Sequence, residues 1–170
     1  KASTALIYSG KLKYDLQNKI YLSAVEQILD IVLTEKIREK LGGTYGVSIS
    51  AELDKTPYDN FSLQLVFDTD PERRVELVNA MKQTMEEMQK TGPSLENVKK
   101  IKEFMTKQHA ENLKENSYTL SVLENMYRFG ADVSTDYQKI LDAMSVESLK
   151  KFSKSIFGQG NLVDVSLSSK

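Results

Sequence analysis

Two residues whose side chains could take part in catalysis lie on either side of Gly42-Gly43 in the sequence. They are Arg38 and Tyr45. Arginine carries a permanently charged planar fork that binds carbonyl or carboxylate groups, and a phenol can donate a hydrogen bond to an oxyanion. Taken alone, these residues favour structural roles. Arg38 would then offset a helix C-terminal dipole and pair with Glu35, and Tyr45 would pack at a strand edge.

The residues of this chain do not provide the ligand set that metal-dependent hydrolysis requires. A catalytic zinc site requires three protein ligands and an open position for water. The chain contains one histidine, His109, and no cysteine, and carboxylates alone favour hard cations over zinc. We therefore expect no metal ligands and no complete catalytic set in this chain. His109 is expected to be a surface or partly packed helix residue.

Length and composition exclude several other classes of function. With 170 residues, the chain is long enough for one well-buried domain and too short for two large ones. Its net charge of −1 gives no field for a polyanion, so we expect no nucleic-acid partner. No apolar run approaches the roughly 20 residues that a membrane-spanning helix needs.

A long amphipathic helix must position Arg38. Apolar residues recur with helical spacing from Leu16 to Leu41, which predicts one wide buried stripe over about 25 residues and about 38 Å. Gly42-Gly43 would end the helix, and residues 47–53 would follow as a strand. Arg38 is thus expected in the last helical turn and Tyr45 at the entry to the strand.

The remaining segments predict an α+β domain with a mixed, largely antiparallel sheet and helices packed on one face. Strands are predicted at residues 5–10, 61–67 and 162–167, and helices begin near residues 71, 94, 119, 134 and 145. Asp70 suits the N-cap of the first of these helices, and Val75 would share its buried face with three methionines. Phe104 is assigned to the buried stripe of the next helix.

The block Arg38-Glu39-Lys40-Leu41-Gly42-Gly43-Thr44-Tyr45 resembles the arginine/tyrosine signature of the M16 zinc metallopeptidases, the group of pitrilysin, insulin-degrading enzyme and the processing peptidases. The bacterial members are the most similar. In that family the signature lies in the C-terminal half, away from the half that binds zinc. The resemblance implies a LuxS/MPP-like metallohydrolase fold, with residues 1–170 forming a single C-terminal-type domain of a longer protein.

The resemblance implies that two different domains contribute to substrate binding and to zinc binding. This chain would enclose the peptide substrate and present Arg38 and Tyr45 to it, while an N-terminal zinc-binding M16 domain, in the same chain or a partner subunit, would hold the metal. The isolated chain would be inactive, and zinc would belong to the parent enzyme. The alternative is a non-catalytic scaffold or interaction domain of a degenerate M16 relative. The resemblance points to a bacterial periplasmic, envelope or cytoplasmic protein.

Overall fold

A four-stranded sheet forms the centre of the domain. The computed structural model describes residues 1–40 and 46–168 of the chain. The strands lie in the order β2-β3-β1-β4, and each neighbouring pair is antiparallel. Their bounds are β1 (Ala2–Lys11), β2 (Val47–Asp54), β3 (Asn60–Thr69) and β4 (Leu162–Ser168). The predicted α+β class is confirmed, and every described pairing in the sheet is antiparallel.

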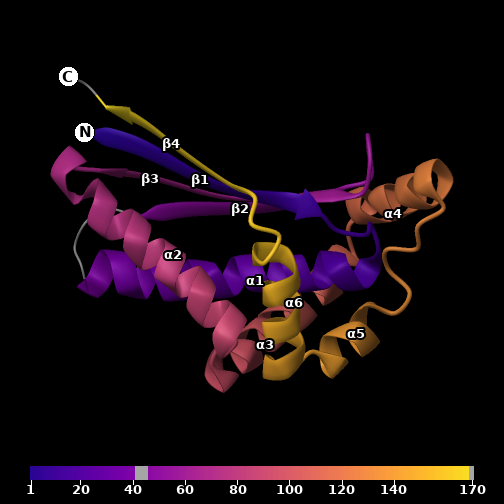
Figure 1. The fold of residues 1–170 in the computed structure, drawn as a ribbon. Coiled ribbons are helices and arrows are strands. Elements are labelled where there is room, and N and C mark those ends of the chain that lie inside the picture. Colours follow the sequence, from indigo (N-terminus) through magenta and orange to yellow (C-terminus); the bar gives the residue numbers. More distant parts are fainter. Residues whose placement is uncertain (41–45, 169–170) are drawn as a thin grey trace.

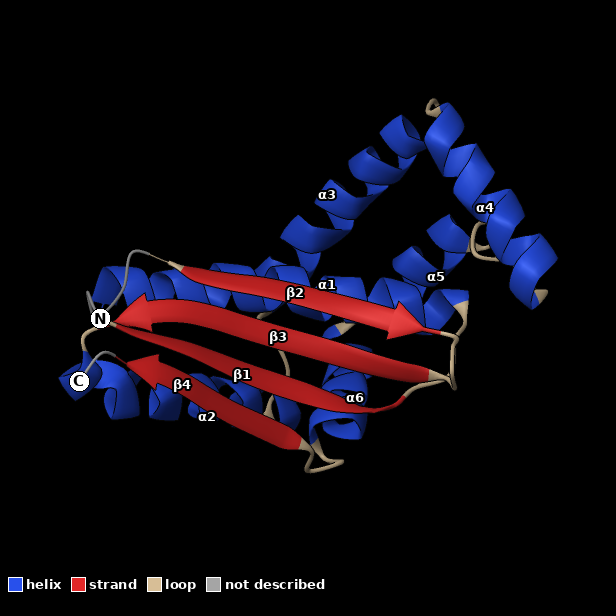
Figure 2. Cartoon of the chain, turned by 90° about the horizontal axis from the view of Figure 1, so that it is seen from above, coloured by secondary structure: helices blue, strands red, loops and turns tan. Residues whose placement is uncertain are grey.

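Helices cover one face of this sheet and leave the other open (Figure 1). Seen from the open face, α1, α2 and α6 lie behind the strands, whereas α3, α4 and α5 extend beyond the β2 edge (Figure 2). The bounds of the α-helices are α1 (Leu16–Leu33), α2 (Arg74–Lys90), α3 (Leu95–Asn112), α4 (Asn116–Phe129), α5 (Tyr137–Ala143) and α6 (Val146–Phe157).

The hydrophobic core lies between the sheet and the helices. Successive side chains of a strand point to opposite faces, and alternate residues of β1 and β3 are accordingly buried. Leu6 and Leu65 from the sheet belong to the same core cluster as Ile28 and Leu29 from α1, and all four are fully buried. The three methionines Met81, Met85 and Met88 of α2 are also buried, which confirms their predicted role as core residues.

The long helix changes its winding before it ends. After α1, the chain continues as a π-helix, η1 (Thr34–Lys40), so the single α-helix expected up to Leu41 is wrong in its last turns. Leu33 and Ile37, four residues apart across this change, are both fully buried. π-helical segments are rare and are found frequently at functional sites, and η1 contains Arg38.

The start of the second long helix corrects two further predictions. Asp70 precedes a short 3₁₀ turn, η2 (Pro71–Arg73), and its side chain makes no capping hydrogen bond; α2 begins only at Arg74. The tighter 3₁₀ turn shifts the phase of the residues that follow. Val75, which the spacing placed on the buried face, is 63% exposed.

The helix that follows begins as predicted but does not bury its whole stripe. The Ser94 hydroxyl accepts a hydrogen bond from the Asn97 backbone N–H at 3.1 Å and caps α3. Val98, Ile101 and Met105 are buried, but Phe104 is 52% exposed. The prediction for Phe104 is wrong because α3 leaves the sheet at the β2 edge, so that this side chain lies beside a surface cavity rather than in the core.

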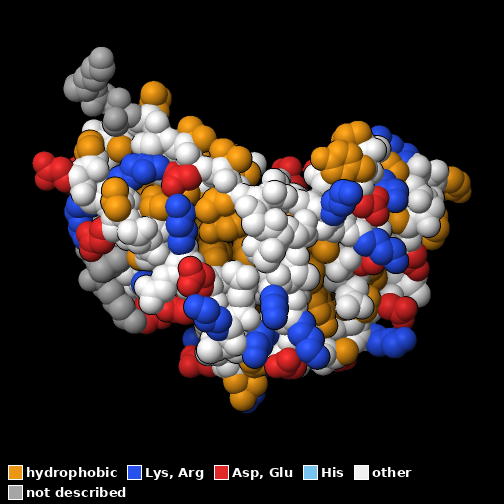
Figure 3. All heavy atoms as spheres, viewed as in Figure 1, with side chains coloured by type: hydrophobic (Ala, Val, Ile, Leu, Met, Phe, Trp, Pro, Cys, Tyr) orange, Lys and Arg blue, Asp and Glu red, His pale blue; other side chains and the backbone are white. Residues whose placement is uncertain are grey.

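The open face of the sheet carries apolar side chains. Register places Ala5 of β1 between Val66 of β3 and Val165 of β4, and Ile7 beside Val163. Val66, Val163 and Val165 are each about half exposed, and Leu167 at the end of β4 is more exposed still. Among the described residues, no helix covers this face (Figure 1), and hydrophobic side chains lie along it (Figure 3).

Candidate functional site

The turn that contains Arg38 is fixed to the body of the domain by its neighbours. Ile37 is fully buried in the core. The Lys36 ammonium group donates a hydrogen bond to the Thr84 hydroxyl at 3.2 Å and lies 3.6 Å from the Glu87 carboxylate, both on α2. The Arg38 backbone belongs to this anchored π-helix, but its side chain lies outside the part of the chain that the structure describes.

Tyr45 lies outside the described residues, and the chain is described again from Gly46. Gly46 is exposed, and no described residue other than its chain neighbours has an atom within 4 Å of the position that a Cβ would take. Val47 opens β2, is buried, and pairs with Phe67 of β3. The predicted contact of the Arg38 and Tyr45 side chains with a substrate therefore stays a prediction.

A surface hollow lies directly beside the position of Tyr45 in the sequence. It has a volume of about 540 Å³ and is lined by residues 46–48, residues 66–68, Lys1 and Ser3. Register brings these segments together at one end of the sheet, where β1 and β2 begin and β3 and β4 end. The hollow is a concave surface of mixed charge, with Lys1 and Asp68 on it.

His109 is part of an aromatic cluster rather than a metal centre. Its ring stacks on Tyr137 with centroids 3.8 Å apart, and its Nδ1 lies 3.5 Å from the Tyr118 hydroxyl. Burial lowers the pKa of His109. Across residues 1–40 and 46–168, no group of three or more histidine, cysteine, aspartate or glutamate side chains could hold a metal ion. The residues present do not fit a catalytic zinc.

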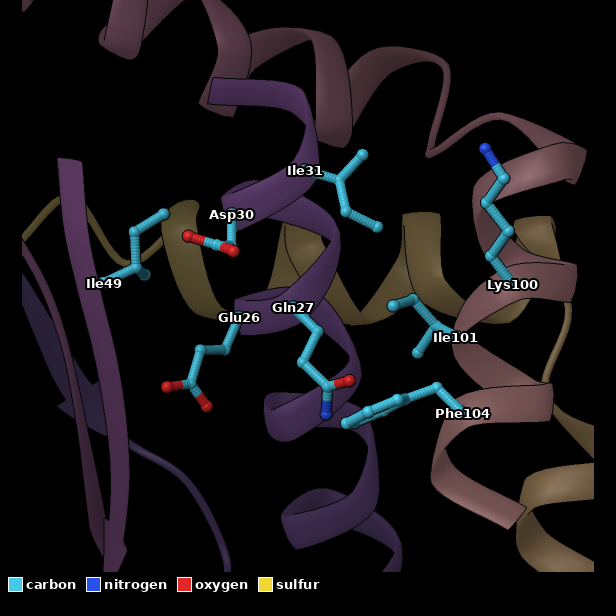
Figure 4. A pocket seen from close by; sticks show the side chains of 8 residues that line it. All are labelled: Glu26, Gln27, Asp30, Ile31, Ile49, Lys100, Ile101 and Phe104. Atoms are coloured by element: carbon cyan, nitrogen blue, oxygen red, sulfur yellow. The ribbon is translucent and has the colours of Figure 1, made fainter. Parts of the chain in front are cut away.

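A second cavity, of about 660 Å³, lies where α1, the β2 edge and α3 meet (Figure 4). Its lining consists of Glu26, Gln27, Asp30 and Ile31 from α1, Ile49 from β2, and Lys100, Ile101 and Phe104 from α3. This cavity was not predicted from the sequence. The available signal was the spacing of Glu26 and Asp30, four residues apart and therefore on one face of the helix, beside the predicted apolar stripe.

The two carboxylates of this cavity differ in their surroundings. Burial raises the pKa of Glu26, Asp30 adds to that rise, and a hydrogen bond from the Ala51 backbone N–H opposes it. Asp30 is exposed. Lys100 on the opposite wall lies 2.7 Å from Glu96, on its own helix. Among the described residues, neither Glu26 nor Asp30 forms an ion pair with a lysine or arginine.

Comparison with models of known protein families shows to which family the chain belongs. The family model described as "Peptidase M16 inactive domain" matches residues 1–105, a segment that includes α1, η1, β2 and most of the sheet. This chain belongs to the M16 inactive-domain family. The family expected from the Arg38–Tyr45 block is confirmed, as is the expected fold class.

Solved structures of M16 proteins share the fold of this inactive domain. The periplasmic protease PqqL from Escherichia coli superimposes with a TM-score of 0.84 at 20% identity, over 99% of this chain and 19% of PqqL. The ferredoxin protease FusC, solved in complex with Arabidopsis ferredoxin, gives 0.79 at 18% identity, over 97% of this chain and 18% of FusC. An M16 inactive domain from Pseudomonas fluorescens gives 0.75 at 20% identity, over 98% of this chain and 41% of that one.

The M16 inactive domain described here thus spans less than half the length of each of these three structures. No curated protein sequence matches it significantly. Within the described residues, no helix is both long enough and apolar enough to cross a membrane.

Proposed function

We propose that this chain is the substrate-enclosing, non-zinc domain of a zinc-dependent M16 metalloendopeptidase, with residues 1–170 forming one C-terminal-type domain of a longer protein. In this role Arg38 and Tyr45 bind the peptide at a zinc site that another M16 domain holds. The observation that carries the proposal is the match to the inactive-domain family over residues 1–105, a segment that contains both residues.

The anchoring of η1 supports a positioning role for Arg38. A group that stabilises developing charge must be held in place before the reaction, because reorganising it would cost free energy. Ile37 in the core and the contacts of Lys36 with Thr84 and Glu87 of α2 hold the backbone of η1 in place. The guanidinium of Arg38 is therefore attached to a backbone segment that contacts with the core and with α2 hold in place.

The open face of the sheet is the surface at which we expect a partner domain to bind. Val66, Val163, Val165 and Leu167 form a partly exposed apolar surface on a face that the described helices leave bare. Large exposed apolar surfaces mark interaction sites. We assign this face to the neighbouring M16 domain, because it adjoins the end of the sheet where β2 begins after Tyr45.

The test is turnover in the protein that joins this domain to its zinc-binding partner. Arg38→Ala and Tyr45→Phe should each lower kcat for peptide cleavage by about 100- to 1,000-fold, the usual effect of removing one oxyanion donor. Arg128→Ala and Tyr127→Phe are matched controls, because both side chains are exposed on α4. Unchanged turnover in both test variants would favour the scaffold alternative instead.

A further inference from the structure

β4 forms the edge of the sheet opposite β2 (Figure 2). Within the described residues it pairs with β1 alone. The Ser9 backbone N–H donates a hydrogen bond to the Asn161 carbonyl at 3.2 Å, in line with the register of these two strands. Successive residues of a strand direct their N–H and C=O groups to opposite sides. The backbone groups of residues 162, 164, 166 and 168 therefore point away from β1, toward the position that a further strand would take.

This edge lacks the features that usually keep strands of different molecules from pairing. Lysine, proline and unbalanced inward-pointing charges serve that purpose in other sheets. Residues 162–168 contain neither lysine nor proline. Their one charged residue, Asp164, lies opposite the fully buried Leu6 and hence on the helix side of the sheet. There it forms ion pairs with Arg74 and Lys82 of α2, so its charge is balanced within the chain.

The side chains of β4 form one apolar row and one polar row along this edge. Val163, Val165 and Leu167 alternate with the residues that face the helices and so lie on the open face of the sheet. They are 51%, 53% and 78% exposed. On the helix side, Asp164 alternates with Ser166. A strand that pairs with this edge must therefore match an apolar row on one face and a polar row on the other.

A second copy of β4 meets this requirement when it runs antiparallel about a two-fold axis at Val165. In that register Val165 lies opposite Val165 of the other copy, and Val163 lies opposite Leu167. Asp164 lies opposite Ser166, so no two like charges face each other. The hydrogen-bonding sides also match, because residues 164 and 166 both direct their N–H and C=O groups outward. An axis at Asp164 would instead place two carboxylates opposite each other.

We propose that this chain associates with a second copy of itself through antiparallel pairing of the two β4 edges, with the two-fold axis at Val165. The pairing joins the two four-stranded sheets into one continuous sheet. It uses the outer edge of β4 and leaves the open face of the sheet uncovered. The proposal goes beyond the proposed function and does not depend on it.

Sedimentation velocity of the 170-residue chain measures this association. We expect mainly monomer at about 1 μM and a substantial dimer fraction at about 100 μM, because one strand edge is a small interface. Val165→Lys should raise the dissociation constant by about tenfold or more, since two ammonium groups would lie opposite each other. Leu120→Lys is the matched control, because Leu120 is also exposed but lies on α4, beyond the β2 edge (Figure 2).

Ser166→Pro provides a second way to block the edge if Val165→Lys fails to fold. The Ser166 N–H points outward, so the proline removes no hydrogen bond to β1, and proline is tolerated in edge strands at such positions. It does remove a donor from the pairing of the two copies. We therefore expect Ser166→Pro to weaken the dimer as Val165→Lys does.

Disulfide formation tests the register, and the chain contains no cysteine that would interfere. Opposite residues that do not exchange hydrogen bonds have Cα atoms about 4.5 Å apart, a separation that a disulfide spans. Val165→Cys should therefore form a disulfide-linked dimer under mild oxidation. Val163→Cys alone should not, because its counterpart in the other copy lies four residues, or about 13 Å, along the strands. The double variant Val163→Cys/Leu167→Cys should cross-link again.

A chain that stays monomeric at the higher concentration would overturn the proposal. So would a dimer that Val165→Lys leaves intact, or one that Leu120→Lys dissociates, since the contact would then lie elsewhere. Cross-linking of Val163→Cys as fast as that of Val165→Cys would contradict the register. Absence of the Val165→Cys cross-link in a protein that joins this domain to a zinc-binding M16 domain would show that another segment occupies the edge, and would also overturn the proposal. The turnover of Arg38 and Tyr45 variants is unaffected by any of these results.

Discussion

Replacing Ile37 tests whether the π-helical turn that bears Arg38 is held in the core. Ile37 is fully buried. The substitution Ile37→Ala removes three carbon atoms, which is worth about 2.5 kcal/mol of transfer free energy. The cavity left behind raises the total loss of unfolding free energy to about 2–5 kcal/mol. In a domain of this size, a loss of ~3 kcal/mol lowers Tm by about 10 °C.

Urea denaturation of the two proteins measures this loss, provided that the m-value is unchanged. Ile31→Ala is the matched control: it is the same substitution in the preceding helix, at a half-buried position that lines the surface cavity. We expect the control to lose no more than about 1 kcal/mol. A loss for Ile37→Ala that is equally small would refute the packing of η1 against the core, and with it the fixed backbone on which the role of Arg38 depends.

Three other features give separate predictions. Ser94→Ala should cost about 1 kcal/mol in urea denaturation because it removes the cap of α3, whereas Asp70→Ala, which removes no capping bond, should cost a few tenths; similar losses would contradict the two assignments. Hydrogen bonds from Thr135 and Ser134 lower the pKa of Asp132 to about 2. Its stabilising effect should therefore be complete above about pH 4 and be lost as the pH falls toward 2, and a carboxyl NMR titration with a midpoint near 4 would contradict this. Equimolar zinc and excess EDTA should both leave Tm unchanged, since the described residues hold no metal-binding group; a rise in Tm with zinc would reveal a site.

Local patterns in the sequence were sufficient for much of the fold. The alternation in residues 61–67 and 162–167 predicted strands that the structure contains as β3 and β4. Ser94 predicted a helix start because a hydroxyl at the N-cap satisfies a backbone donor that the helix leaves free. These predictions succeed because the interactions that determine them join residues that are close in sequence.

The predictions that failed depend on effects outside the local pattern. Val75 became exposed because a 3₁₀ turn shifted the phase of the helix, and Phe104 because α3 extends beyond the sheet. The cavity lined by Glu26, Ile49 and Lys100 could not be predicted, since it exists only where three elements distant in sequence meet. The family signature, by contrast, was recognisable from residues alone.

The turnover of a Tyr45→Phe variant shows whether this domain takes part in peptide cleavage, because the substitution removes one oxygen atom and keeps the aromatic ring. The measurement compares kcat and KM for peptide cleavage by the protein in which this domain is joined to a zinc-binding M16 domain. We expect a loss of about 100- to 1,000-fold in kcat with a small change in KM, since the phenol would stabilise the developing oxyanion. A kcat equal to that of the Tyr127→Phe control would contradict it.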